Sequence, residues 1–392
     1  MARKEIGSGN LFFGRQSHGG PFISPGGDGA IVYGIFAPGN ADLRAFKAGA
    51  DPLVDAWSEQ DSGNRPTNDG SAHWCHQEGS LIHCVNCDEL TTDKGRISYH
   101  VFNTGSDTWT TRDTVVSDPS GDPPIAGASC FIFIQTDGDK VVVGPGEQDK
   151  VKGTGFDRVD FWRDTGAGFG GANAIDDGGE IDYVTPTGLG VGNRVHAVYS
   201  QRADGAGTWT GSSKTIRDND TLSSRTTLNN VPGNGGSFGI GVHYDDGGTE
   251  RCRIPMRVIT TLQTEVLEFD DADSPSITEN TGVSDNAVFA ADGADHSLSL
   301  DAKEVRLLYS DNVTQDIFTD TNDDDAGWGT DTEVEDGVLA SRMWSRVIDR
   351  DGLKVAYTYR DGSTGQFYNE IDLGGAPPEF LHKKPIRQYL RM

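Results

Sequence analysis

The 392-residue sequence has no long apolar run and almost no helical periodicity. No stretch approaches the roughly 20 consecutive apolar residues that a membrane-spanning helix needs, so we expect no membrane insertion. The first ten residues, MARKEIGSGN, are charged but lack the apolar segment of a signal peptide. We therefore expect a protein that is made in the cytoplasm without a cleaved leader.

Basic residues are scarce: 33 lysines and arginines stand against 60 acidic residues, and the formal net charge is −27. Such a surface repels nucleic acid and anionic membranes, so we expect no direct nucleic-acid binding. The C-terminal stretch 376–392 is an exception because it is basic. We predict that basic residues in this stretch contact another copy of the chain or an acidic partner protein. These assembly residues are Lys383, Lys384, Arg387 and Arg391. A solvated, unstructured tail is the alternative interpretation.

Cysteines number only five, which is an odd count with no framework spacing, and this favours reduced thiols. Three of them lie in WCHQEGSLIHCVNC (74–87), where a zinc site and a β-hairpin are the competing interpretations. A two-residue turn at Glu78-Gly79 would make this stretch a hairpin. Side chains alternate between the two faces of a strand, so Cys84 and Cys87 would point in opposite directions. We therefore expect sheet here and no metal site.

Short strands are what the sequence has in abundance. Segments such as IVYGIF (31–36), ISYHVF (97–102) and EVRLLYS (304–310) are separated by Gly-, Asp- and Asn-rich turns. A pattern of strands, hairpin and aromatic residue recurs about every fifty residues, which is typical of propeller blades. We predict an all-β protein, a single six- or seven-bladed β-propeller over residues 21–375. Residues 1–20 form an N-terminal extension or a ring-closing strand, and residues 376–392 form the basic tail.

Two segments, FNTGSDTWTT (102–111) and YSQRADGAGTWTG (199–211), resemble the Asp-box (BNR) hairpins of sialidase-like propellers. Both are degenerate: Asp107-Thr108-Trp109 lacks the glycine of the pattern, and Asp204-Gly205 are too close together. ISYHVFNTGSDTW and VRLLYSDNVTQDIF also look like segments of β-propellers in tailed bacteriophages and prophages. That resemblance implies a structural, non-enzymatic virion component, in a tail nozzle or hub or in the receptor-contacting part. It further implies a homo-oligomer with neighbouring virion tail proteins as partners.

Two further motifs carry candidate chemistry. CRIP (252–255) resembles the Arg-Ile-Pro motif of sialidases, in which the arginine binds a substrate carboxylate, so Arg253 is the sialidase-like candidate. DTNDDDAGWGTD (320–331) has the alternating oxygen donors of a calcium loop, but it lacks the glycine and the final glutamate of an EF-hand. It is the candidate glycan or calcium loop through Asp320, Asn322, Asp324 and Trp328, and an ordinary acidic turn is the alternative.

No motif of a serine hydrolase, a phosphate-binding loop or a zinc peptidase occurs. We therefore expect no catalytic residues and no resident cofactor beyond calcium at the Asp-rich loop. The leading hypothesis is the structural virion component. The alternatives are a lectin-like propeller that binds a host surface glycan, and a sialidase-type glycoside hydrolase.

Overall fold

The computed structural model describes most of the chain, and the descriptions below concern those residues only. They are 3–8, 19–24, 31–36, 42–66, 73–91, 94–117, 130–145, 158–176, 187–191, 193–201, 210–229, 238–246, 249–258, 260–270, 272–289, 296–301, 304–322, 327–350, 352–362 and 365–373.

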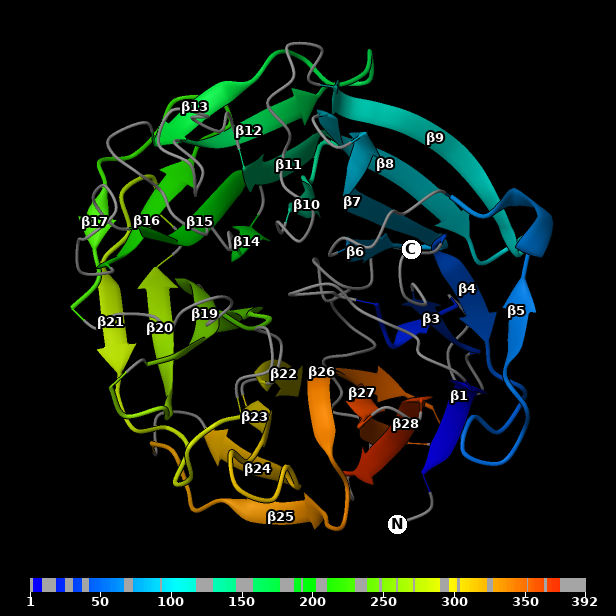
Figure 1. The fold of residues 1–392 in the computed structure, drawn as a ribbon. Coiled ribbons are helices and arrows are strands. Elements are labelled where there is room, and N and C mark those ends of the chain that lie inside the picture. The colour runs from blue at the N-terminus through cyan, green and yellow to red at the C-terminus, as the bar shows by residue number, and fades with distance from the viewer. Residues whose placement is uncertain are drawn as a thin grey trace.

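Seven four-stranded antiparallel sheets are arranged around a central axis, so the molecule is a seven-bladed β-propeller (Figure 1). This confirms the predicted all-β propeller and sets the number of blades at seven. The helical content of the described residues is one short 3₁₀ turn, η1 (Ser62–Asn64). None of these residues form a helix that is long and apolar enough to cross a membrane.

Blades 1 to 6 each run from an innermost strand to an outermost one in chain order. The strands of blades 1 to 3 are β2 (Phe22–Ile23), β3 (Val32–Phe36), β4 (Arg44–Lys47), β5 (Ser58–Gln60); β6 (His73–Glu78), β7 (Leu81–Thr91), β8 (Lys94–Asn103), β9 (Thr108–Ser117); and β10 (Phe131–Ile134), β11 (Lys140–Pro145), β12 (Val159–Asp164), β13 (Asn173–Asp176).

Blades 4 to 6 follow the same plan. Their strands are β14 (Thr187–Val191), β15 (Arg194–Gln201), β16 (Thr210–Ile216), β17 (Thr226–Thr227); β18 (Val242–Asp246), β19 (Thr249–Arg257), β20 (Thr264–Asp270), β21 (Ile277–Asn280); and β22 (His296–Asp301), β23 (Glu304–Ser310), β24 (Ile317–Asn322), β25 (Thr332–Glu335).

Blade 7 joins the two ends of the propeller. Its first three strands are β26 (Ala340–Asp349), β27 (Leu353–Asp361) and β28 (Gly365–Asp372). The outermost strand is β1 (Lys4–Ser8), which pairs antiparallel with β28 and places Glu5 opposite Phe367. The start of the chain therefore supplies the last strand of the last blade, and this pairing closes the ring.

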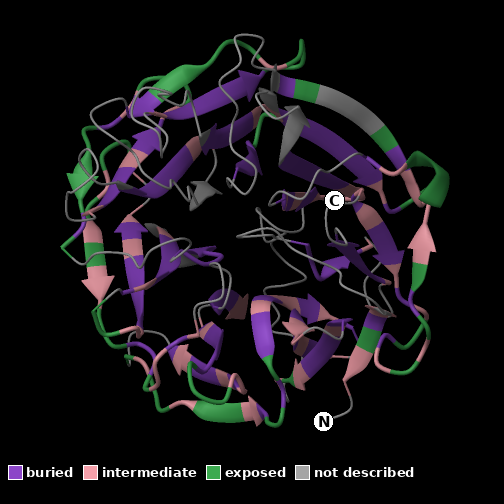
Figure 2. Ribbon diagram, in the orientation of Figure 1, coloured by how far each residue is buried: buried purple, intermediate pink, exposed green. Residues whose placement is uncertain are grey.

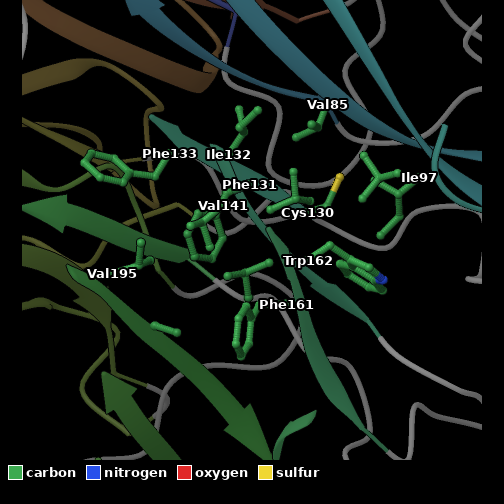
Figure 3. Packing of buried hydrophobic residues seen from close by; sticks show 14 of the residues in the cluster. Val85, Ile97, Cys130, Phe131, Ile132, Phe133, Val141, Phe161, Trp162 and Val195 are labelled. Atoms are coloured by element: carbon green, nitrogen blue, oxygen red, sulfur yellow. The ribbon is translucent and has the colours of Figure 1, made fainter. Parts of the chain in front are cut away.

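The hydrophobic core lies between neighbouring blades rather than at one centre. The largest cluster joins blades 2, 3 and 4, and Figure 3 shows Val85 and Ile97 from blade 2 facing Phe131 and Trp162 from blade 3. Exposed residues lie mainly on the outermost strands and the connections (Figure 2). Because each sheet is covered on both faces by its neighbours, most of the described side chains on the second strands of the blades are buried.

The β6–β7 hairpin is present, but its turn is one residue further along than predicted. Glu78 pairs with Leu81, so the turn residues are Gly79 and Ser80. Gly79 has φ +54° and occupies the first central position, which in the common two-residue hairpin turns needs a positive φ. The predicted turn at Glu78-Gly79 would have put glutamate there, which is the physical reason that it is wrong.

The predicted alternation along 81–86 is confirmed. Val85 packs into the cluster shared with blades 3 and 4, whereas Ile82 and Cys84 pack into the cluster shared with blade 1. The side chain of Cys87 lies outside the described part of the structure. The hairpin is therefore a blade element whose sulfur atoms fill space between sheets.

The two Asp-box-like segments are not equivalent in the structure. Ser106 and Asp107 lie in the turn between the third and fourth strands of blade 2, just before β9. The second segment spans the connection between the second and third strands of blade 4, and residues 202–209 are outside the described part. The similarity of the two sequence segments therefore does not mean that they occupy the same position in two blades.

Candidate functional site

The outer hairpin of blade 6 brings together most of the residues that the sequence singled out in 320–331. Thr319 of β24 pairs with Thr332 of β25, so the next residues towards the turn are Asp320 and Asp331. An isolated bridge between Asn322 and Trp328 continues the pairing to the turn. We call Asp320, Asn322, Trp328 and Asp331 the blade 6 notch.

The notch contains three buried acceptor oxygens that have no hydrogen-bond partner among the described residues. They are Asp320 Oδ2, Asn322 Oδ1 and Asp331 Oδ1, and the parent residues Asp320 and Asn322 are only 3% and 7% exposed. A buried polar group left unpaired costs about 1–3 kcal/mol. These oxygens therefore favour a donor from outside the chain, either water or a ligand.

The other oxygens of the two carboxylates are fixed by the protein. The backbone N–H of Thr321 donates to Asp320 Oδ1 over 2.6 Å. The Tyr309 hydroxyl and the backbone N–H of Asp285 both donate to Asp331 Oδ2, each over 2.5 Å. Each carboxylate is thus held by one oxygen and presents the other without a partner.

Charge at the notch is negative and partly shielded from water. Burial raises the pKa of Asp320, and the nearby Asp331 and Asp285 carboxylates raise it further. Burial also raises the pKa of Asp331, with Asp285 adding to the effect. Both shifts reflect an environment that disfavours additional negative charge, so the notch is better suited to hydroxyl or cationic donors than to anions.

Trp328 supplies an apolar surface at the same place. Its side chain is half-buried and packs against the cluster between blades 5 and 6, where Phe318 also lies. The ring is therefore held in position while part of it stays accessible. A fixed aromatic ring beside buried acceptors is an arrangement that can bind a ligand with both an apolar face and hydroxyl groups.

No group of three or more His, Cys, Asp or Glu side chains in the described ranges is placed to hold a metal ion. The notch offers two carboxylates and one amide oxygen, which are hard ligands of the kind that calcium prefers. Asp324 lies outside the described residues, so calcium binding by Asp320, Asn322 and Asp324 stays a prediction.

A hollow of about 240 Å³ lies at the other end of β25. Its lining residues are Arg3, Glu333, Val334, Glu335, Asp336 and Val338. Glu335 accepts hydrogen bonds from the hydroxyls of Tyr357 (2.9 Å) and Tyr359 (2.6 Å), and Arg3 pairs with Asp361 over 2.7 Å. The tyrosine bonds join blade 7 to blade 6, and the Arg3–Asp361 pair holds the start of the chain against β27. These contacts give Glu335 and Arg3 a structural role where the ring closes.

Arg253 lies on β19 in blade 5 and is only 5% exposed. Its Nε donates to Glu268 Oε2 over 3.0 Å, and its guanidinium carbon lies 5.3 Å from the centre of the Tyr244 ring. One side of the guanidinium is thus held inside the blade, whereas Arg253 Nη1 is buried without a hydrogen-bond partner among the described residues. The sialidase-like role of Arg253 therefore stays a prediction. The basic residues Lys383, Lys384, Arg387 and Arg391 lie outside the described part of the chain, and their assembly role stays a prediction.

Asp331 and Asp285 were not among the predicted site residues. The signal for Asp331 was available, because pairing across the hairpin places it beside Asp320. Asp285 comes from the connection between blades 5 and 6, and its contact with Asp331 depends on how the two blades pack. Only the tertiary structure reveals it.

Comparison with known proteins places the chain among propellers and no further. No family model matches, and no curated protein matches. The fungal lectin from Aleuria aurantia, a six-bladed β-propeller, is 10% identical, with 84% of this chain and 97% of that chain covered and a TM-score of 0.50. The protein AofleA from Arthrobotrys oligospora is 13% identical over 79% of this chain and 84% of its own, with a TM-score of 0.48.

A subtype N10 neuraminidase-like protein of A/little yellow-shouldered bat/Guatemala/060/2010 is also similar. It is 11% identical over 76% of this chain and 93% of its own, with a TM-score of 0.46. At these identities the likeness is one of fold. The tailed-phage resemblance gains no support from these comparisons, and the virion location and tail partners stay predictions.

Proposed function

We propose that the protein is a carbohydrate-binding propeller and that the blade 6 notch is its binding site. The observation that carries the proposal is the set of unpartnered acceptor oxygens, Asp320 Oδ2, Asn322 Oδ1 and Asp331 Oδ1, beside the half-buried Trp328. The lectin alternative drawn from the sequence therefore replaces the structural virion component as the leading function.

The chemistry of the notch fits a sugar in two respects. Sugar hydroxyls are donors, and carboxylate and amide oxygens are acceptors with free lone pairs. A pyranose ring also has an apolar face, which an aromatic ring such as that of Trp328 can cover. Hydrogen bonds from hydroxyls to ionised carboxylates are stronger than those between neutral groups, so Asp320 and Asp331 would contribute most of the specificity.

The charge of the notch narrows the ligand class to neutral sugars. Two carboxylates with raised pKa values lie at the notch, and Asp285 adds a third acidic group nearby. A sialic or uronic acid would bring a further negative charge into this environment, where like charges repel. The Aleuria aurantia lectin shows only that a β-propeller scaffold can recognise a sugar.

The test is binding of the purified protein to immobilised neutral and acidic oligosaccharides at the same density. The proposal predicts retention by at least one neutral glycan and none by sialylated or sulfated ones. Binding confined to acidic glycans would contradict the ligand class, and no binding to any glycan would contradict the function. Asp301→Asn is a matched control, because Asp301 also has a raised pKa and an unpartnered oxygen but belongs to the inner hairpin of the same blade.

A further inference from the structure

Two buried cysteines face each other across the β6–β7 hairpin. Cys75 and Cys84 are directly opposite in the antiparallel register, and both are fully buried. Their sulfur atoms are 2.9 Å apart. Non-bonded heavy atoms usually rest about 3.5–4.0 Å apart, so the two sulfurs are closer than simple packing requires.

The position suits a covalent bond between them. Directly opposite residues of an antiparallel pair have Cα atoms about 4.5 or 5.5 Å apart, depending on the type of pair. A disulfide needs Cα atoms about 4.4–6.8 Å apart, so either type of pair can be bridged without moving the strands. The observed register is what places the two cysteines opposite each other, because a turn at Glu78-Gly79 would instead have placed Cys75 opposite Ile82.

The surroundings leave the pair no evident alternative role. Both sulfurs lie in an apolar cluster with Ile82, Phe102 and Trp109, from the second, third and fourth strands of blade 2. In the described part of the chain no third ligand completes a metal site around them. Cys130 and Cys252 are also buried, but they lie in the separate clusters of blades 2 to 4 and of blades 4 and 5.

We propose that Cys75 and Cys84 form a cross-strand disulfide when the chain folds in the presence of a disulfide oxidant such as oxidised glutathione. One cysteine thiolate attacks the oxidant and releases one glutathione thiolate, leaving a mixed disulfide. The second cysteine thiolate then attacks the sulfur of its partner and releases the second glutathione. Two cysteines are oxidised, one glutathione disulfide is reduced to two thiols, and the two cysteine protons pass to the released thiolates.

Burial determines when this reaction occurs. In the folded chain burial raises the pKa of the Cys75 thiol, so little reactive thiolate is present once the hairpin has packed. The bond therefore forms while the hairpin is still open, and afterwards the same packing shields it from reductants. This proposal is independent of carbohydrate binding, because blade 2 and blade 6 are separate sheets.

The test is to refold the full chain with oxidised glutathione or with dithiothreitol, quench in acid, and alkylate the thiols under denaturing conditions. We expect three of the five cysteines to be alkylated after oxidative refolding and all five after reductive refolding. Peptide mapping of the wild-type protein should show the link between Cys75 and Cys84. The oxidised form should melt about 3 °C higher, from the entropy of a short closed loop and the size of the chain.

Cysteine variants identify which thiols react, although the wild-type protein alone is enough to test the proposal. Cys130→Ala and Cys252→Ala should still lose two alkylatable thiols on oxidation, whereas Cys84→Ala should leave its four remaining cysteines reactive. Five reactive thiols after oxidative refolding would overturn the proposal. A link between another pair, such as Cys84 with Cys87, would overturn it equally, and this readout needs only the wild-type chain.

Discussion

The Tyr199 hydroxyl donates a hydrogen bond to Asp176 Oδ2 over 2.6 Å and thereby joins the second strand of blade 4 to the outer strand of blade 3. The same device recurs between blades 6 and 7, where Tyr357 and Tyr359 donate to Glu335. Asp176 and Glu335 each pair beside a bulge near the end of an outer strand. Buried tyrosine–carboxylate bonds are thus a repeated way in which this propeller fastens one blade to the next.

Tyr199→Phe should destabilise the protein by about 1–3 kcal/mol, because it leaves the buried Asp176 oxygen without this donor. Urea unfolding of wild type, Tyr199→Phe, Asp176→Asn and the double variant would measure the coupling between the two side chains. Additive losses in the double variant would show that the bond contributes nothing of its own.

Stability should fall as the pH is lowered from about 6.5 towards 4. Burial lowers the pKa of His73 and of His296 to about 4 in each case, so both are neutral in the folded protein and titrate near 6.5 when it unfolds. The unfolded chain binds more protons in that window, which costs about 1.4 kcal/mol per pH unit for each histidine. Their contribution is fully present above pH 6.5 and is lost as the pH falls towards the folded pKa.

The measurement is the free energy of unfolding at pH 7.5 and pH 5.5 for the wild type and for His73→Asn. Between these two pH values the variant should lose about 1.4 kcal/mol less stability than the wild type, because His73 titrates over only about one pH unit of the interval. An identical slope in both proteins would contradict the assignment of this acid sensitivity to His73.

Ring closure should depend on β1. Ile6 is 4% exposed and packs into the cluster shared by blades 7 and 1, so Ile6→Ala should cost about 2–5 kcal/mol. Val313→Ala is the control, because Val313 is 85% exposed and its truncation should change stability by less than about 0.5 kcal/mol. Equal midpoints of denaturant unfolding for the two variants would show that β1 does not contribute to closure.

Arg253→Ala should lower stability without changing sugar binding. Removing the guanidinium breaks its ion pair with Glu268 inside blade 5, with an expected loss of about 1–3 kcal/mol. The affinity for a neutral oligosaccharide should be unchanged, because the notch is in blade 6. A folded variant that loses glycan binding or glycoside turnover would return Arg253 to the sialidase role predicted from CRIP.

The sequence predicted the architecture because strand periodicity and spacing are local properties. It also predicted which faces Ile82, Cys84 and Val85 present, since alternation needs only the strand itself. The predicted turn of the β6–β7 hairpin was wrong by one residue, so the sequence did not reveal that Cys75 and Cys84 lie opposite each other. A shift of the turn by one residue changes which residues lie opposite each other across the hairpin.

The site was only partly predictable for a related reason. Asp320, Asn322 and Trp328 are close in sequence, so a motif could indicate them. The contacts of Asp331 with Tyr309 and with Asp285 join segments from different strands and from a neighbouring blade connection. Such contacts follow from blade packing, which sequence spacing does not encode.

The most direct test of carbohydrate binding at the notch is calorimetric titration of one neutral oligosaccharide into the wild type, Trp328→Ala, Asp320→Asn and the control Asp301→Asn. We expect the two notch variants to bind at least about tenfold more weakly, which corresponds to about 1.4 kcal/mol, and Asp301→Asn to bind like the wild type. Unchanged affinity in folded Trp328→Ala and Asp320→Asn would show that the sugar binds elsewhere and would contradict the assignment of the blade 6 notch.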